Sequence, residues 1–90
     1  MAPTELFHIG FGNMVAAGRV LAIVAPDSLP VRRLLREARE RGTLVDASRG
    51  RKVKSAIVMD NGYVITSALH PQTIARRLRS GEFPGRRQDE

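Results

Sequence analysis

The clearest structural signal in the sequence is the stretch Ser55-Ala-Ile-Val-Met-Asp-Asn-Gly-Tyr-Val-Ile-Thr-Ser-Ala68. It places two apolar runs of strand length on either side of Asn61-Gly62, a dipeptide that favours a tight type I′ hairpin turn. We therefore expect antiparallel strands over residues 55–60 and 63–68. This hairpin is the centre around which the other predicted elements are arranged.

Four shorter segments upstream of the hairpin have the composition of strands. They are Leu6–Ile9, Met14–Ala17, Val20–Ala25 and Thr43–Asp46. Between the first two lies Gly10-Phe-Gly-Asn13, which predicts a turn with positive φ at either glycine or at Asn13.

Residues 28–41 carry the signals of an amphipathic helix. Asp27 or Ser28 can cap its amino end, and Pro30 suits its first turn because the missing N–H is not needed there. Gly42 stands where a left-handed residue ends a helix. Residues at i, i+3, i+4 and i+7 form one apolar stripe, namely Val31, Leu34, Leu35 and Ala38.

A second, shorter helix is expected from about His70 to Arg79, with Ile74, Ala75 and Leu78 as its apolar stripe. The order of elements predicts one α+β domain over residues 1–80, with a mainly antiparallel sheet and two helices. Residues 81–90 are Gly, Pro and charged residues without periodicity and predict a disordered tail.

The chain is small for an independent fold, with 90 residues and no Cys to form disulfides. Its strands Val20–Ala25 and Ala56–Met59 are apolar without clean alternation, so both faces of the sheet need cover. Two helices can cover one face. The other face is then open to a second subunit, with cover from within the chain as the alternative.

The sequence offers little for catalysis, and it implies no cofactor and no metal. Its two histidines, His8 and His70, have no cluster of acids around them and are expected at the surface or at a helix cap. Gly10-x-Gly12 lacks the third glycine of a dinucleotide fingerprint, since Val15 occupies that position. With no signal peptide and no apolar run long enough to span a membrane, we expect a cytoplasmic protein without membrane association.

Charge is the strongest functional signal. Fifteen Lys and Arg against nine Asp and Glu give a formal net charge of +6, which favours nucleic acid or an acidic partner. The segment Arg49-Gly-Arg-Lys-Val-Lys54 holds four cations, and no acid lies between Asp46 and Asp60. Phosphate would relieve the repulsion among these cations, and an arginine fork suits phosphate or guanine. The alternative is an ordinary exposed basic loop.

Other arginines are better explained by their helices. Three i,i+4 pairs are expected on the first helix, namely Arg33–Glu37, Arg36–Glu40 and Glu37–Arg41. Arg32 and Arg39 have no such acid and could contact phosphate. Arg76, Arg77 and Arg79 crowd the end of the second helix, where the helix dipole favours cations. No aromatic residue lies within eight positions of Arg51, which favours duplex DNA over single strands, whose bases stack on aromatic side chains.

Several blocks of the sequence, in order and spacing over about residues 5–80, resemble the RemA family of bacterial extracellular matrix regulators. The blocks are Ile9-Gly-Phe-Gly-Asn13, Pro30-Val-Arg-Arg33, Gly42-Thr-Leu-Val-Asp-Ala47, Gly50-Arg-Lys52 and Leu69-His-Pro-Gln-Thr-Ile-Ala75. The resemblance implies a LytTR-like DNA-binding fold and an activator of biofilm-matrix genes. It also implies a homo-oligomeric ring of about seven or eight subunits, or a multiple, with closed symmetry.

The resemblance places the DNA contacts of the family on Arg51 and Lys52, and Lys52 stands where the family usually has Arg. We therefore expect a non-enzymatic transcription regulator that binds double-stranded DNA through Arg49, Arg51, Lys52 and Lys54, with Arg32 as a further candidate. The alternative is a structural or scaffolding ring that binds an acidic protein, with DNA binding incidental. Sequence-specific RNA binding is a third hypothesis, disfavoured by the scarcity of aromatic residues.

Overall fold

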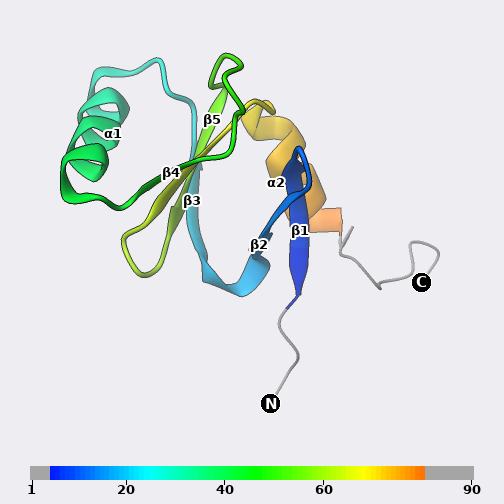
Figure 1. Ribbon diagram of the computed structural model, residues 1–90. Coiled ribbons are helices and arrows are strands. Elements are labelled where there is room, and N and C mark those ends of the chain that lie inside the picture. Colours follow the sequence, from blue (N-terminus) through cyan, green and yellow to red (C-terminus); the bar gives the residue numbers. More distant parts are fainter. Residues whose placement is uncertain (1–4, 81–90) are drawn as a thin grey trace.

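The computed structural model of the protein describes residues 5–80 (Figure 1). The segment 81–90, where the sequence predicts a disordered tail, lies outside the described residues. In chain order the elements are β1 (Leu6–Gly10), β2 (Asn13–Ala16), β3 (Val20–Val24), α1 (Leu29–Arg41), β4 (Leu44–Asp46), β5 (Ser55–Met59), β6 (Val64–Ser67) and α2 (Pro71–Ser80). A 3-10 turn, Ala17–Arg19, joins β2 to β3. Every predicted strand and helix is therefore present, with bounds that differ by one residue.

The β5–β6 hairpin forms the centre of a four-stranded sheet with the order β3-β5-β6-β4. β3 pairs antiparallel with β5, and β5 antiparallel with β6, but β4 runs parallel to β6. The sheet is therefore mainly antiparallel, as the sequence predicts, but it has one parallel pair, at the β4 edge, that the sequence did not indicate. The physical reason is α1, which carries the chain across the sheet from one edge strand to the other, as a parallel connection requires.

The turn of this hairpin is not type I′, which corrects the sequence prediction. The amide of Gly62 donates to the carbonyl of Met59 (3.1 Å), and the amide of Met59 donates to the carbonyl of Tyr63 (2.8 Å). Gly62 has a φ of 91°, but Asn61 is not in the positive-φ region, which a type I′ turn requires at both central residues. The loop has the three-residue form, a turn closed by a left-handed glycine.

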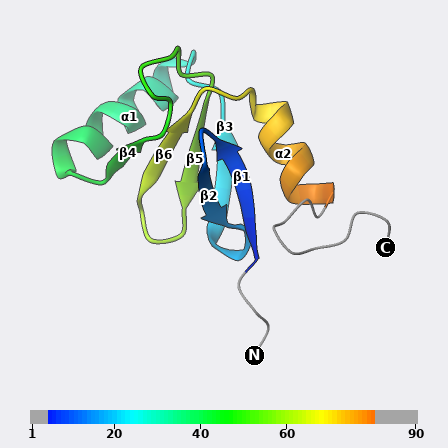
Figure 2. The same cartoon turned by 45° about the vertical axis from the view of Figure 1, so that its right-hand side comes forward.

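The two helices cover opposite faces of the sheet, so the expectation that both cover one face is wrong (Figures 1 and 2). On one face, Leu34, Leu35 and Ala38 of α1 pack on Ala56 and Val64. On the other face, the β1–β2 hairpin and α2 enclose the larger apolar cluster, whose fully buried members are Phe7, Ile9, Ile57 and Ile74. Cover for both faces thus comes from within the chain.

The ends of α1 are set by the residues that the sequence indicates. The hydroxyl of Ser28 accepts a hydrogen bond from the amide of Val31 (3.3 Å), and Pro30 lies in the first turn. Gly42 ends the helix in the left-handed conformation, with a φ of 78°. For α2, the carbonyl of His70 accepts from the amide of Ile74 (3.1 Å), which confirms the interpretation of His70 as a cap residue.

Substitution of Gly62 separates backbone strain from packing, because a Cβ built at Gly62 has no atom within 4 Å. The positive φ makes Gly62→Ala strained, and we expect its free energy of unfolding to fall by about 1 kcal/mol. The control is Gly18→Ala, which has equal space and no positive φ. There the free energy of unfolding stays unchanged or rises by up to about 1 kcal/mol. Equal losses in urea unfolding of the two variants would contradict this account of the turn.

Candidate nucleic-acid interface

The basic loop, residues 47–54, connects β4 to β5 and holds four of the five predicted site residues. Its tip is a tight turn in which the amide of Arg51 donates to the carbonyl of Ser48 (3.0 Å). The two central residues, Arg49 and Gly50, have φ values of 54° and 77°. Positive φ at both positions is the pattern of a type I′ turn, so the turn expected at Asn61-Gly62 occurs here instead. Glycine adopts this conformation without steric strain, but arginine is strained in it because of its Cβ.

One carboxylate oxygen anchors the start of the basic loop. Oδ1 of Asp46 accepts hydrogen bonds from the amide of Ser48 (2.9 Å), the hydroxyl of Ser48 (2.6 Å) and the hydroxyl of Thr66 (2.8 Å). The two hydrogen bonds from Ser48, followed by that from Thr66, lower the pKa of Asp46 below its ordinary value of 3.8. Arg39, on α1, adds a weaker electrostatic contribution in the same direction. Ser48 and Thr66 are buried, whereas Asp46 itself is exposed, so the carboxylate joins the exposed start of the loop to buried hydroxyl groups.

The carboxyl end of β6 holds both the basic loop and the tip of the β1–β2 hairpin. The amide of Ala47 donates to the carbonyl of Thr66, and the amide of Lys54 donates to that of Ser67, both at 2.9 Å. The buried hydroxyl of Ser67 donates to the carbonyl of Ile9 (2.8 Å), at the end of β1. Two consecutive residues of one strand thus fix two loops that are far apart in the sequence.

The β1–β2 turn brings Phe11 against the basic loop. The guanidinium carbons of Arg49 and Arg51 lie 5.5 Å and 5.8 Å from the centre of the Phe11 ring, within the range of cation–π contacts. The sequence-based prediction places no aromatic residue near Arg51 because it counts positions along the chain. Phe11 lies 40 positions away in the sequence and still contacts Arg51 in the fold. Glycines on both sides of Phe11 indicated a turn tip, but nothing in the sequence indicated what that tip touches.

The glycines of this turn adopt the predicted positive φ, with 106° at Gly10 and 79° at Gly12. Asn13, the third candidate, does not; its side-chain amide instead donates to the carbonyl of Gly10 (3.1 Å). Phe11 takes the positive φ in its place, with a value of 55°. A left-handed non-glycine residue costs roughly 1–3 kcal/mol and persists only where the surrounding structure holds it.

The cations of the basic loop are exposed and border two hollows. Arg51, Lys52 and Lys54 line one of about 470 Å³ together with Phe11 and Leu69, and no carboxylate lines it. The other, of about 310 Å³, lies between Lys52, Lys54 and the residues that lead into both helices, among them Asp27 and His70. The amino ends of α1 and α2 therefore lie at the same end of the molecule as the basic loop. Helix amino ends carry partial positive charge, so this end attracts anions.

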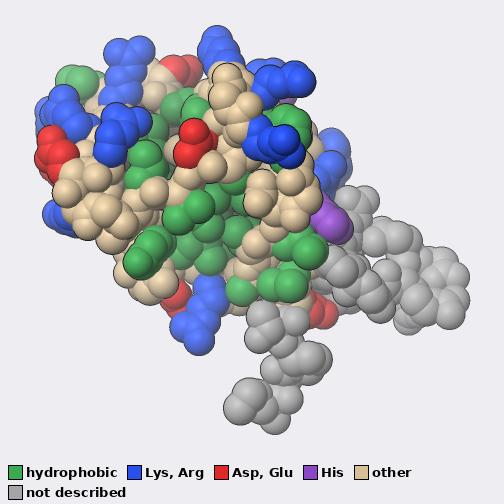
Figure 3. All heavy atoms as spheres, viewed as in Figure 1, with side chains coloured by type: hydrophobic (Ala, Val, Ile, Leu, Met, Phe, Trp, Pro, Cys, Tyr) green, Lys and Arg blue, Asp and Glu red, His purple; other side chains and the backbone are tan. Residues whose placement is uncertain are grey.

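Arg32 lies exposed in the first turn of α1. It shares this end of the molecule, but within residues 5–80 no hydrogen bond, ion pair or ring contact joins it to the basic loop. Blue side chains gather along the upper rim in Figure 3, over α1 and the β4–β5 connection. The middle of that face is mostly apolar.

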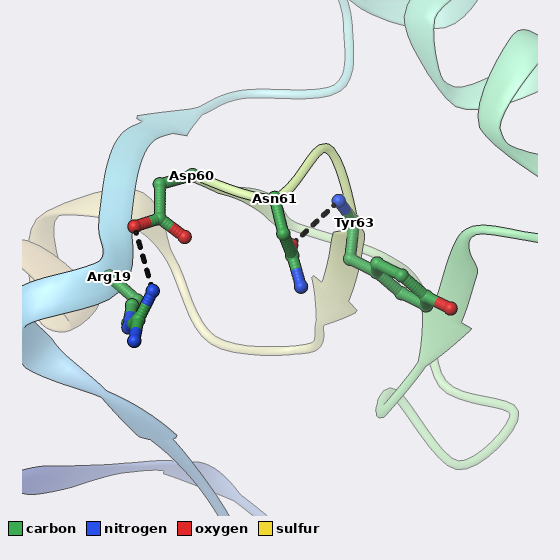
Figure 4. A network of polar contacts seen from close by, with 4 residues as sticks. All are labelled: Arg19, Asp60, Asn61 and Tyr63. Carbon is green, nitrogen blue, oxygen red and sulfur yellow. Dashed lines mark hydrogen bonds and ion pairs between the residues drawn. The ribbon is translucent and has the colours of Figure 1, made fainter.

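Other arginines serve packing or lie elsewhere. Arg77 donates to the carbonyl of His8 (3.1 Å) and so ties α2 to β1. Arg19 forms an ion pair with Asp60 (3.5 Å) beside the hairpin turn, where the side chain of Asn61 accepts from the amide of Tyr63 (Figure 4). None of the three i,i+4 pairs expected on α1 closes to within 4.0 Å, because these exposed side chains extend into solvent.

The part of the chain that the structure describes contains no group of three or more His, Cys, Asp or Glu residues placed to hold a metal ion. Neither helix within it is long and apolar enough to cross a membrane. His8 is exposed on β1, as a surface histidine is expected to be.

The Asp46 anchor predicts a specific dependence of stability on pH. Since the pKa of Asp46 is lowered in the folded state, its carboxylate stabilises the fold above its unfolded-state pKa. This stabilisation is lost as the pH falls below about 4 through the lower folded-state value. In urea unfolding, the wild-type protein should therefore exceed Asp46→Asn in stability near neutral pH and lose that margin in acid.

Thr66→Val keeps the carboxylate and removes one of its donors, so it should retain part of this acid dependence. Identical acid dependence in the wild type and Asp46→Asn would rule out an ionised anchor.

Comparison with known proteins agrees with the resemblance seen in the sequence. The RemA-like family, described as extracellular matrix regulatory protein A-like, matches residues 6–78. A protein of Synechococcus sp. (strain JA-3-3Ab) is 56% identical over 75 residues, which cover 83% of this chain and 84% of the relative. One from Dictyoglomus turgidum is 49% identical over 78 residues (87% and 92%), and one from Pelotomaculum thermopropionicum 47% over 85 residues (94% and 93%). All three relatives carry the name "Putative regulatory protein". The chain therefore belongs to the RemA-like family, described as extracellular matrix regulatory protein A-like.

Proposed function

We propose that this protein is a transcription regulator that binds duplex DNA through the basic loop, residues 47–54. Membership of a family with a regulatory description supports a regulatory role. The observation that carries the DNA proposal is the anchored loop itself. Four exposed cations project from a turn whose base is buried and hydrogen-bonded, at the end of the molecule where both helices begin.

The concentration of positive charge in the basic loop favours the binding of phosphate groups. The side chains of Arg49, Arg51, Lys52 and Lys54 crowd six residues without an acid among them, and the turn prevents them from spreading. Backbone phosphates neutralise such a cluster and release counterions, which makes binding favourable and dependent on salt. Arginine forks suit phosphate oxygens and guanine edges, while lysines act as point charges on phosphate.

The single aromatic side chain at the loop still favours a duplex. Proteins that track single strands use successive aromatic platforms for successive bases. Here Phe11 stands beside the loop with two guanidinium groups against it, and Tyr63 lies by the hairpin turn with Arg19 and Asp60. One partly covered ring does not make a stacking track. Phosphate contact by arginines is the recognition mode that remains.

We also propose that the protein assembles into a ring through the two edges of its sheet. β3 and β4 are the edge strands, and each carries an exposed large apolar residue, Leu21 (71% exposed) and Val45 (46%). Between β2 and the β5–β6 hairpin, the exposed residues Met14 and Tyr63 border a further hollow of about 390 Å³. Two different apolar surfaces on opposite edges suit a head-to-tail contact, which closes into a ring when the rotation between subunits permits.

The first experiment measures binding to a duplex of about 30 base pairs by fluorescence anisotropy at about 50 and 200 mM salt. With roughly 6–10 phosphates contacted, the affinity of the wild type should fall by roughly 10³–10⁵ between these concentrations. Arg51→Ala should weaken binding and reduce the slope of affinity against salt by about one for each subunit that contacts the duplex, because each of these subunits loses one phosphate contact.

The matched control is Arg33→Ala, which removes an exposed arginine from α1 and should change affinity by less than about twofold. Unchanged binding by Arg51→Ala would move the interface away from the loop. Binding that is insensitive to salt would refute the electrostatic proposal, and retention of an acidic protein after nuclease treatment would favour the scaffold alternative.

The second experiment tests assembly by light scattering. Leu21→Glu introduces a charge at the β3 edge and should yield smaller species with an unchanged circular dichroism spectrum. Affinity for duplex DNA should then fall by about a hundredfold or more, because several loops no longer bind together. Leu29→Glu is the control for the light-scattering measurement alone, since Leu29 is 66% exposed but lies at the start of α1, away from the β3 edge and near the basic loop. A full-size assembly of Leu21→Glu would exclude the β3 edge.

A further inference from the structure

Phe11 occupies a position that burial does not explain. Phe11 is 44% exposed, so it adds little to the apolar core, whereas Phe7 and Ile9 of β1 are fully buried in it. The ring instead contacts two guanidinium groups, those of Arg49 and Arg51, at 5.5 Å and 5.8 Å. These residues come from different loops, and the contact exists only in the folded protein.

The two residues of this contact, Phe11 and Arg49, both have a strained backbone conformation. Within residues 5–80, Phe11 and Arg49 are the two non-glycine residues with positive φ, at 55° and 54°, and they touch each other. Both strained turns are held from β6: Ser67 bonds to Ile9 next to the first turn, and Thr66 bonds to Asp46 next to the second. Leu69 packs against Gly10, where a Cβ would lie 3.5 Å from its Cγ. Strained residues that the fold holds in place occur most often at functional sites.

The aromatic ring of Phe11 is well suited to hold two arginine side chains that repel each other. Each arginine side chain has many rotamers in solvent, and binding an anion must freeze them. Stacking on an aromatic face restricts the guanidinium plane while its N–H edges stay available for phosphate. The ring is neutral, so it does not compete for the anion as a carboxylate would. The hollow that Phe11 shares with Arg51, Lys52 and Lys54 has no carboxylate in its lining.

We propose that Phe11 is a positioning residue of the nucleic-acid interface: its ring holds the guanidinium groups of Arg49 and Arg51 ready for phosphate without itself touching the nucleic acid. This role rests on the proposed function of the basic loop. It adds to that function a residue from another part of the chain whose contribution passes through the two arginines.

The test compares Phe11→Leu with Phe11→Tyr in the full chain, by anisotropy with the same duplex at two salt concentrations. Leucine keeps apolar bulk without an aromatic face, and affinity should fall by about tenfold. Tyrosine keeps the face, and affinity should stay within about twofold of the wild type. The salt slope should not change in either variant, because the number of phosphates neutralised is the same.

A double-mutant cycle distinguishes positioning from direct contact. In a background of Arg49→Ala and Arg51→Ala, Phe11→Leu should have no further effect on affinity, because the side chains that the ring positions are gone. An undiminished tenfold loss in that background would mean that the ring contacts the nucleic acid and would overturn the positioning role. If Arg51→Ala weakens binding but Phe11→Leu does not, the positioning role fails and the proposed function stands. If Arg51→Ala has no effect, the proposed function itself fails.

A spectroscopic measurement keeps the proposal testable if Phe11→Leu does not fold. The sequence has no Trp, so Phe11→Trp introduces one fluorophore at the site and retains an aromatic face. Its emission in the free protein should shift when Arg49→Ala and Arg51→Ala are added, because the stacked cations are lost. Identical emission with and without the two arginines would show that no stack exists in solution and would overturn the proposal.

Discussion

A single carboxylate oxygen, Oδ1 of Asp46, links the sheet to the basic loop. It accepts three hydrogen bonds, two from Ser48 and one from Thr66, at the point where β4 ends and the loop begins. Without this anchor, residues 47–54 would be a charged connection whose cations separate to reduce their repulsion. With it, the turn at Arg49-Gly50 is set beside β6, and Lys54 bonds back to Ser67. The charge becomes a surface of defined shape because an exposed carboxylate, bonded to the buried side chains of Ser48 and Thr66, holds the base of the loop.

Local signals in the sequence predicted local structure well. Ser28, Pro30 and Gly42 mark the ends of α1 because capping involves neighbours in the chain. The turn types were harder, because Asn61-Gly62 suits both a two-residue and a three-residue loop. The structure uses the three-residue form there and places the turn with two positive φ values at Arg49-Gly50. The type of turn in which a glycine is used depends on the register of the two strands that the turn joins.

Features that depend on tertiary contact could not be predicted from patterns. An amphipathic stripe tells which side of a helix is buried but not which face of a sheet it covers, and α1 and α2 cover opposite faces. The parallel pairing of β4 with β6 follows from the path of α1. Of the candidate site, the four loop cations are exposed together as expected, and DNA binding by them stays a prediction. Phe11 was missed because its partners lie far along the chain.

The positions of the loop and of the sheet edges have a consequence for assembly. The basic loop, the β1–β2 turn and the amino ends of both helices lie at the ends of the strands, whereas the exposed apolar residues of β3 and β4 lie along the two sides of the sheet. The direction from one edge strand of the sheet to the other is perpendicular to the direction along the strands. Subunits joined edge to edge would therefore carry every basic loop on the same rim. A modest cluster of four cations would then recur around the rim, and the binding of each loop would raise the effective concentration of phosphate at the next.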